Sequence, residues 1–287
     1  MDEQRLTENR LAILGLAALA VLTVIVFAVC FLGAGNLFSS DPKPQVEQSS
    51  TQGISDFETT DQEQLASGLA EMRNKMNSFQ TLLDSPYLML VGDSSPLPST
   101  FEVGDTVLLS GSDTVKMEKA AGEQMNAFFK AAEKAGFAAT VTAAYRTEKQ
   151  QQKVFDAAVE DFMNAGYPAE VARTKAAASV GSVNCSEHQL GLAVDFSKKE
   201  MNLLGVDGRS FEEYLNDTMH KYGYILSYPT GKETQTGHDA NTVHYRYVGV
   251  AAATEMKELD LTLAEYRDYL QTQIDYLKQH IQSKENK

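Results

Sequence analysis

The residues that could do chemistry lie in one short stretch, SEHQLGLAVDF at positions 186–196, and in a later one, VHYRYV. The first contains His188 and, seven positions on, Asp195; the second contains His244. An apolar run that ends in a carboxylate raises a question, because a buried charge is costly unless it is paired or bound to a metal. Two histidines and one carboxylate are enough protein ligands for a catalytic zinc ion. Asp195 is therefore either a solvated strand end or a zinc ligand together with His188 and His244.

Alternation along both stretches predicts strands with two different faces. In the first strand, the face of Asp195 carries the small residues Gly191 and Ala193, which leave room beside the carboxylate. In the second strand, His244 and Arg246 share one face. Each candidate ligand thus lies in a strand or at its edge, where its position would be rigid.

Hydrophobic periodicity and turn residues place the elements that must hold these side chains. We expect helices over 63–85, 114–135, 147–166, 168–180 and 210–223, and strands over 137–145, 222–229 and 243–248. Ser210 with Glu213, and Thr262 with Glu265, match the capping box that starts a helix. Helices that mostly precede and follow a group of short strands predict an α+β domain over residues 86–287.

Residues 11–33 predict a single transmembrane anchor. The run from Leu11 to Leu32 has no charged residue, and at about 1.5 Å per residue it can cross a hydrocarbon core of roughly 30 Å. A cleaved signal peptide is the rival interpretation, but its apolar region is usually only about 7–15 residues long. Two arginines in the polar tail 1–10 place the N-terminus in the cytoplasm by the positive-inside rule. The rest of the chain would then lie outside the cell.

Residues 34–62 are rich in Ser, Thr, Gln, Asp and Pro, which predicts a flexible linker. The amphipathic helix over 63–85 has heptad-like spacing, and we expect it to pack against the following domain rather than to form an oligomeric stalk. The formal net charge of -14 argues against a nucleic-acid partner, because phosphate binding needs a basic surface. Cys185 is the only cysteine outside the predicted span, and it is either a packing residue or a thiol nucleophile.

Three separate segments resemble the VanY-type zinc D,D- and L,D-carboxypeptidases. SEHQLGLAVDF resembles the Ser-x-His-x-x-Gly-x-Ala-x-Asp signature of the family, and AAYRTEKQQ at 143–151 resembles its upstream Tyr-Arg-Ser/Thr…Gln segment. YGYILSYPTGKETQTG and the later VHYRYVG are similar to the downstream block that contains the second histidine. The order and spacing agree over about residues 86–269.

The resemblance implies a D-Ala-D-Ala carboxypeptidase/hedgehog-like α+β fold, in which helices flank a small antiparallel sheet. It also implies Zn²⁺ as cofactor, with the ligands His188, Asp195 and His244. By the same resemblance Arg146 would contact the carboxylate of the substrate or the developing oxyanion. Ser186 and Gln151 would line the substrate site.

The chain departs from the family where the general base is expected. A Glu-Pro-Trp-His sequence in the family places a glutamate three residues before the second histidine, whereas this chain has Asn241 at that position and no tryptophan. Asparagine cannot accept a proton from water, and loss of a general base costs about 10²–10⁴-fold in rate. Asp239, with His238 beside it, is the candidate substitute. Ser227 also replaces an arginine that is usual in the family.

Residues and resemblance together predict a membrane-anchored extracellular zinc carboxypeptidase. It would remove the C-terminal D-alanine from peptidoglycan stem peptides. One alternative is a catalytically impaired pseudoenzyme that acts as a peptidoglycan-binding or regulatory module, which the loss of the base favours. Another is zinc amidase chemistry on a different bond of the wall.

Overall fold

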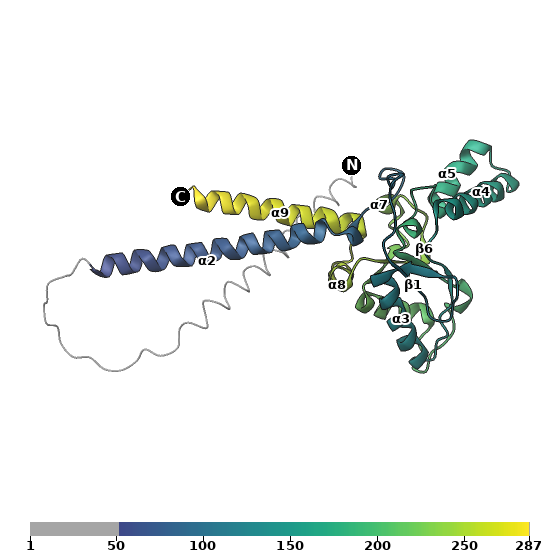
Figure 1. Ribbon diagram of the computed structural model, residues 1–287, viewed down its shortest axis with the longest axis horizontal. Helices are drawn as coiled ribbons and strands as arrows, with labels where there is room; N and C mark the ends of the chain where they lie inside the picture. Colours follow the sequence, from purple (N-terminus) through teal and green to yellow (C-terminus); the bar gives the residue numbers. More distant parts are fainter. Residues whose placement is uncertain (1–51, 287) are drawn as a thin grey trace. The chain divides into compact units, whose positions relative to one another are not determined.

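The computed structural model describes residues 52–286 of the chain (Figure 1). The predicted tail 1–10, the predicted anchor 11–33 and the linker up to residue 51 lie outside the described residues. Among residues 52–286, no helix combines the length and the hydropathy that a membrane span requires. Residues 59–287 form one compact unit, which contains the sheet and the candidate site.

Helix α2 (Gln52–Leu83) begins earlier than the predicted helix over 63–85. The expected flexible linker was therefore wrong for residues 52–62, which are helical. Once a helix is nucleated, each further residue adds one hydrogen bond, so a polar stretch without proline can extend it towards its N-terminus. At its other end, Phe79, Leu82 and Leu83 pack against a buried apolar cluster that includes residues of α9 (Leu263–Glu285).

A four-stranded antiparallel sheet forms the centre of the domain, in the order β3-β4-β6-β5. Its strands are β3 (Val141–Ala143), β4 (Ala193–Phe196), β5 (Tyr224–Tyr228) and β6 (Asn241–Tyr247). Strand β6 lies between β4 and β5, so the last strand in the sequence is central in the sheet. Because of this order, Asp195 pairs directly with His244, and Ala193 pairs with Arg246.

The ends of one predicted strand and one predicted helix differ from the structure, because pairing between strands determines where these elements begin and end. The strand predicted over 137–145 is shortened to β3, because its partner β4 is short and the register shifts between Val141 and Ala143. The first residues of the helix predicted over 114–135 instead form β2 (Lys116–Glu118), which pairs with β1 (Thr106–Leu108). Helix α3 follows directly over Lys119–Lys134.

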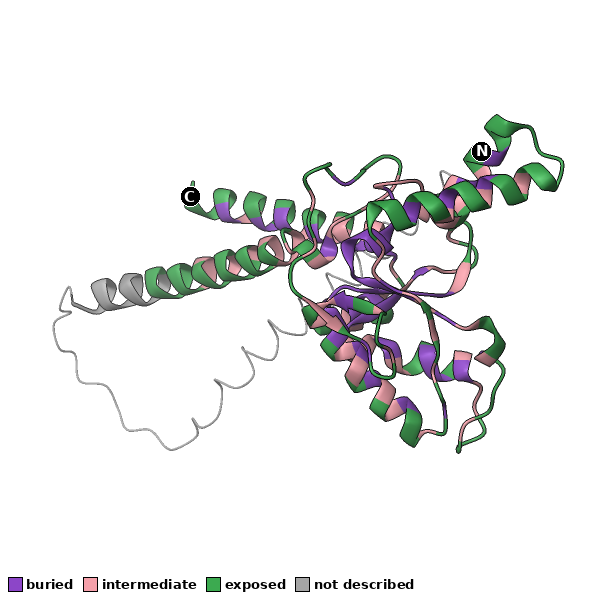
Figure 2. Ribbon diagram, turned by 45° about the vertical axis from the view of Figure 1, so that its right-hand side comes forward, coloured by how far each residue is buried: buried purple, intermediate pink, exposed green. Residues whose placement is uncertain are grey.

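The main apolar core lies on one face of the sheet. Val194, Phe196 and Tyr245 point from β4 and β6 into a cluster with Phe128 of α3 and Leu215 of α6 (Phe211–Thr218). Figure 2 shows the buried residues concentrated in the sheet and on the helix sides that face it. Since neighbouring residues of a strand point to opposite faces, residues next to these in β4 and β6 face the other side. That other side carries the candidate ligands.

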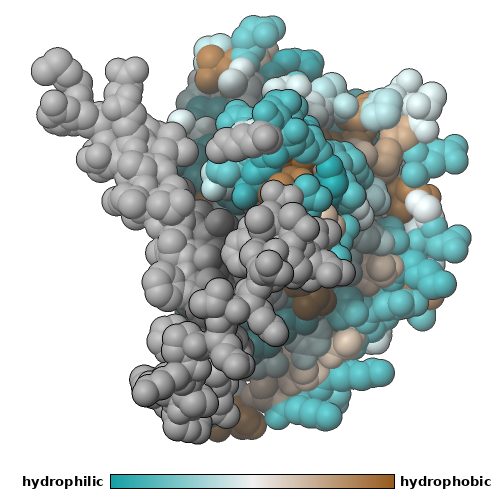
Figure 3. Space-filling model, turned by 90° about the vertical axis from the view of Figure 1, so that its left-hand side faces the viewer, coloured by the Kyte–Doolittle hydropathy of each residue, from teal (hydrophilic) through white to brown (hydrophobic). Residues whose placement is uncertain are grey.

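The described residues also form other helices and 3-10 turns. They are η1 (Pro86–Leu88), α4 (Glu148–Asn164), α5 (Ala169–Val180), η2 (Glu187–Leu190), η3 (Lys198–Glu200), η4 (Met219–Tyr222), α7 (Glu233–Thr236) and α8 (Val250–Leu259). Helices α4 and α5 form a hairpin with a small apolar cluster of its own (Figure 1). The capping boxes predicted for α6 and α9 are confirmed. The described surface visible in Figure 3 is largely hydrophilic, with small apolar areas, as is ordinary for a globular protein.

Candidate metal centre

Three elements bring the predicted ligands together. Asp195 lies in β4 and His244 opposite it in β6, while His188 lies in the 3-10 turn η2 that precedes β4. The turn ends at Gly191, whose φ of 73° is left-handed. A Cβ at this glycine would lie 3.0 Å from Val103 Cγ1 and 3.2 Å from a backbone nitrogen. A glycine is therefore needed here for the chain to fold back and place His188 beside the strand that follows.

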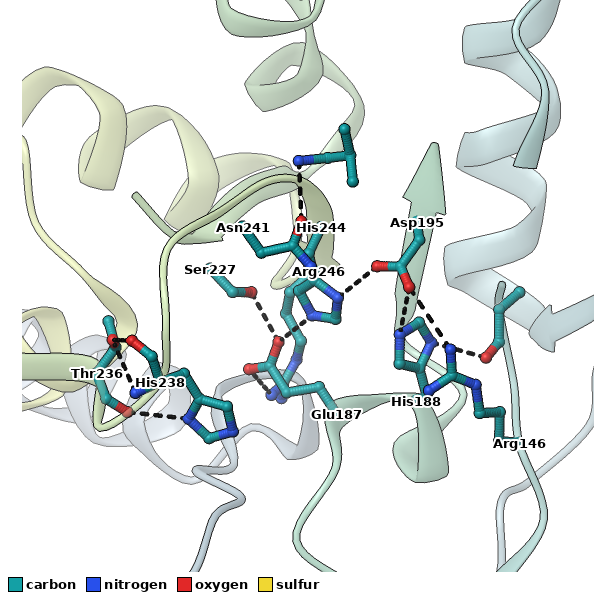
Figure 4. Close-up of polar contacts among 12 residues, drawn as sticks. Arg146, Glu187, His188, Asp195, Ser227, Thr236, His238, Asn241, His244 and Arg246 are labelled. Carbon is teal, nitrogen blue, oxygen red and sulfur yellow. Dashed lines mark hydrogen bonds and ion pairs between the residues drawn. The ribbon is translucent and has the colours of Figure 1, made fainter. Parts of the chain in front are cut away.

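The donor atoms of the three residues converge (Figure 4). His188 Nε2 lies 3.1 Å from Asp195 Oδ2, and His244 Nδ1 lies 2.7 Å from Asp195 Oδ1. One potential ligand atom from each residue lies within 4.8 Å of the others. Both histidines are buried, and the Asp195 side chain keeps 17% of its surface exposed. Two imidazoles and a carboxylate at a partly open position fit the ligand set of a catalytic zinc ion.

Electrostatics ties these three groups to one another. Burial alone would raise the pKa of Asp195, but the two imidazoles lower it well below its usual value. Burial lowers the pKa of His188, in spite of the opposing effect of Asp195. Burial also acts to lower the pKa of His244, but the carboxylates of Asp195 and Glu187 raise this pKa to about 9. Metal binding requires that the ligand nitrogen of His244 carries no proton.

Glu187 is a functional candidate that the sequence reasoning missed. It is only 6% exposed, and its carboxylate accepts hydrogen bonds from Ser227 Oγ at 2.7 Å and from Arg246 Nη1 at 2.9 Å. Its Oε2 also lies 3.0 Å from His244 Nε2 (Figure 4). Although burial acts in the opposite direction, Arg246, His244 and Ser227 hold the pKa of Glu187 far below its usual value. The signal in the sequence was Arg246, since a buried arginine on the face of His244 requires an acidic partner.

Arg146 lies at the edge of the metal centre. Its Nη2 lies 3.6 Å from Asp195 Oδ2, and its Nη1 donates to Gln151 Oε1 at 3.2 Å. Gln151 is fully buried and donates in turn to the carbonyls of Val180 and Gly181, both at 2.8 Å. Burial lowers the pKa of Arg146, and Asp195 acts against this shift. A guanidinium held beside the metal ligands can bind an anionic group of a substrate.

Ser186 is placed less directly. It is buried, at 4% exposure, and is the residue from which the turn η2 starts. Its side chain makes no capping hydrogen bond to that turn. The structure thus places it next to Glu187 and His188 along the chain, and its contact with a substrate stays a prediction.

The residues near the missing base are arranged differently. Asn241 starts β6, and its Oδ1 accepts a hydrogen bond from the backbone nitrogen of Val243 at 3.3 Å. Asp239 is exposed, and within residues 52–286 its carboxylate makes no hydrogen bond or ion pair and is not part of the group formed by His188, Asp195 and His244. Its role as a substitute base stays a prediction. His238 stacks on Tyr228 at 4.4 Å between ring centroids, and Tyr228 stacks on His244 at 4.9 Å.

Comparison with known proteins connects this geometry to a family. The family model for VanY, described as D-alanyl-D-alanine carboxypeptidase, matches residues 114–250. A D-alanyl-D-alanine carboxypeptidase of Enterococcus faecalis is 33% identical over 181 residues, which cover 62% of this chain and 65% of the relative. The chain thus spans less than two thirds of that relative.

Two solved structures resemble the domain in both fold and sequence. VanYB in complex with D-alanine-D-alanine has a TM-score of 0.57 and 30% identity, over 64% of this chain and 98% of the other. A mutant VanY from a VanB-type vancomycin-resistance cassette, in complex with Zn(II), has a TM-score of 0.57 and 31% identity, over 63% and 99%. These comparisons and the donor set support Zn²⁺ as the cofactor.

Proposed function

Because the chain belongs to the VanY family of D-alanyl-D-alanine carboxypeptidases, we propose that its domain removes the C-terminal D-alanine from peptidoglycan stem peptides. The observation that carries the proposal is the convergence of His188, Asp195 and His244 beside the guanidinium of Arg146. The solved relatives bind D-alanine-D-alanine and Zn(II), in agreement with this assignment.

His188, Asp195 and His244 would hold the zinc ion, and Arg146 would bind the substrate. A bound zinc ion would polarise the scissile carbonyl and lower the pKa of a water molecule towards about 7. Arg146 neutralises negative charge on the terminal carboxylate or on the developing oxyanion, because its guanidinium lies beside the centre. Gln151 holds Arg146 in place through its two bonds to backbone carbonyls.

Turnover is slow in this proposal, because Asn241 cannot accept a proton and its side chain is bonded to the backbone of Val243. The same observation favours a second candidate function. A chain that keeps the ligands and Arg146 but lacks the base would bind stem peptides without cleaving them. It would then act as a peptidoglycan-binding or regulatory module.

Incubation of the zinc-loaded full-length protein, in detergent, with stem tetrapeptides and pentapeptides tests these alternatives. We expect slow release of D-alanine, measured by mass spectrometry, and no release by the His188→Ala variant. Peptide binding without release over long incubation would refute the enzyme and support the binding module. Cleavage at another bond would instead indicate an amidase.

We further propose that residues 11–33 anchor the protein in the membrane, with the tail 1–10 in the cytoplasm and the domain outside the cell. The proposal rests on the charge-free apolar run and on the arginines that precede it. Without protease, the protein should be recovered in the membrane fraction. A protease added to intact spheroplasts should degrade the C-terminal domain. Protection of the domain would contradict the orientation.

A further inference from the structure

We propose that Glu187 is a positioning residue of the metal centre, which orients the His244 ring so that Nδ1 faces the other ligands. This inference rests on the metal centre of the proposed function. It goes beyond the ligand set, because Glu187 itself would not touch the metal.

The two nitrogens of His244 have different surroundings. Nδ1 points to Asp195 Oδ1 at 2.7 Å, on the side where His188 lies, and Nε2 points to Glu187 Oε2 at 3.0 Å. An imidazole that binds a metal through one nitrogen usually donates from the other to a carboxylate or carbonyl, which selects the tautomer and the ring orientation. Glu187 is the carboxylate in that position.

Other contacts of His244 cannot select the ring orientation in the same way. Tyr228 stacks on the ring with an interplanar angle of 26°. A stacked neighbour restricts the ring plane, but it contacts the ring face equally after the ring turns by half a rotation about its bond to Cβ. Asp195 is itself a predicted ligand. Among the contacts of residues 52–286, only the bond to Glu187 distinguishes the two orientations from outside the metal centre.

Glu187 is held by donors from two strands of the sheet. Ser227 of β5 donates to Oε2, and Arg246 of β6 donates to Oε1. Ser227 is 7% exposed and Arg246 is fully buried. Removal of one partner from a buried ion pair leaves an uncompensated charge, so the carboxylate and the guanidinium depend on each other. Ser227 is thus one of the two donors from the sheet that hold the Glu187 carboxylate.

Arg246 connects this network to the start of the domain. Its Nη2 donates to the carbonyls of Tyr87 at 3.1 Å and Met89 at 2.9 Å, at the turn η1. The guanidinium is therefore held on one side by backbone and on the other by Glu187. A chain of direct hydrogen bonds runs from η1 through Arg246 and Glu187 to His244, and each of its members is buried or partly buried.

Zinc affinity of the full-length protein in detergent, measured by competition with a chromophoric chelator, tests the inference. We expect Glu187→Gln to bind zinc about 10–100-fold more weakly than the wild type, as is typical for loss of such a partner. Ser227→Ala, which removes one donor to Glu187, should have a smaller effect. Glu265→Gln is the matched control, because it changes a glutamate whose hydrogen bonds go to Thr262 and Lys232, and it should keep wild-type affinity.

A second readout separates orientation from folding stability. In zinc-loaded protein with ¹⁵N-labelled histidine, the Nε2–H signal of His244, assigned by its loss in His244→Gln, should be protected from exchange. This signal should be absent or split in Glu187→Gln. If Glu187→Gln fails to fold, Ser227→Ala takes its place in the experiment and should show a weakened signal. Wild-type affinity together with a protected signal in these variants would overturn the inference. If instead the wild type binds zinc no better than His188→Ala, the metal centre of the proposed function fails, and not the role of Glu187 alone.

Discussion

Replacement of Asn241 by glutamate tests the proposed function most directly. Asn241 lies three residues before His244 in β6, opposite the register shift between Leu226 and Tyr228. Such irregularities re-aim side chains and are frequent next to active sites. The Asn241→Glu variant restores a carboxylate that can accept a proton at the position where the resemblance places the general base. The substitution replaces none of the three metal ligands.

The expected gain follows from two opposing effects. A positioned general base contributes about 10²–10⁴-fold to the rate. Against this, the substitution removes the hydrogen bond from the Val243 nitrogen to Asn241 Oδ1, which at 3.3 Å is long. The net contribution of such a bond is about 1 kcal/mol. If this stabilisation of the active arrangement is lost entirely, kcat falls roughly fivefold. We therefore expect kcat to rise by roughly 20- to 2,000-fold.

The assay is D-alanine release from stem peptides by the zinc-loaded protein, with kcat and KM determined separately. Asn241→Gln is the matched control, because it has the length of glutamate without a proton acceptor of that strength, and its rate should stay near that of the wild type. A gain should appear in kcat and not in KM, since the base acts on the reaction and not on binding. If Asn241→Glu binds zinc and peptide normally but gains no rate, a different group activates the water and the reasoning is refuted.

Three further predictions concern binding, core packing and pH. Arg146→Ala should lower kcat/KM for stem peptides by roughly 10- to 150-fold, since hydrogen bonds to a charged group contribute about 1.5–3 kcal/mol; an unchanged value would exclude substrate contact. Phe128→Ala should lower the free energy of unfolding by about 3–5 kcal/mol in a denaturant titration, because this fully buried ring packs between α3 and the sheet. Glu265 has a lowered pKa, since bonds from Thr262 and Lys232 outweigh burial. Its contribution to stability is present above the unfolded pKa of about 4.3 and is lost as the pH falls through the folded value. The melting temperatures of wild type and Glu265→Gln should therefore differ at pH 7 and converge once the pH has fallen below the folded pKa of Glu265; a constant difference would contradict this.

Local sequence patterns were sufficient for much of the fold. The capping boxes at Ser210 and Thr262 depend on side chains three residues apart, and both are present in the structure. Alternation correctly separated Asp195 from the apolar residues beside it, because strand geometry makes neighbouring side chains face opposite ways. The predicted family and the α+β class are confirmed. The start of α2 was missed, because extension of an existing helix by polar residues leaves no periodic signal.

Local sequence patterns were not sufficient to predict the complete metal centre. The sequence by itself determined the residue types of the donor set and the strands that carry Asp195 and His244. Only the tertiary structure decided that β4 and β6 are neighbours, which places two residues 49 positions apart at 2.7 Å. It also decided that Glu187 is buried against Arg246, whereas Asp239 remains exposed. The physical reason is that the burial and pairing of a charge depend on which distant segments pack around it, and neighbours along the chain do not specify them.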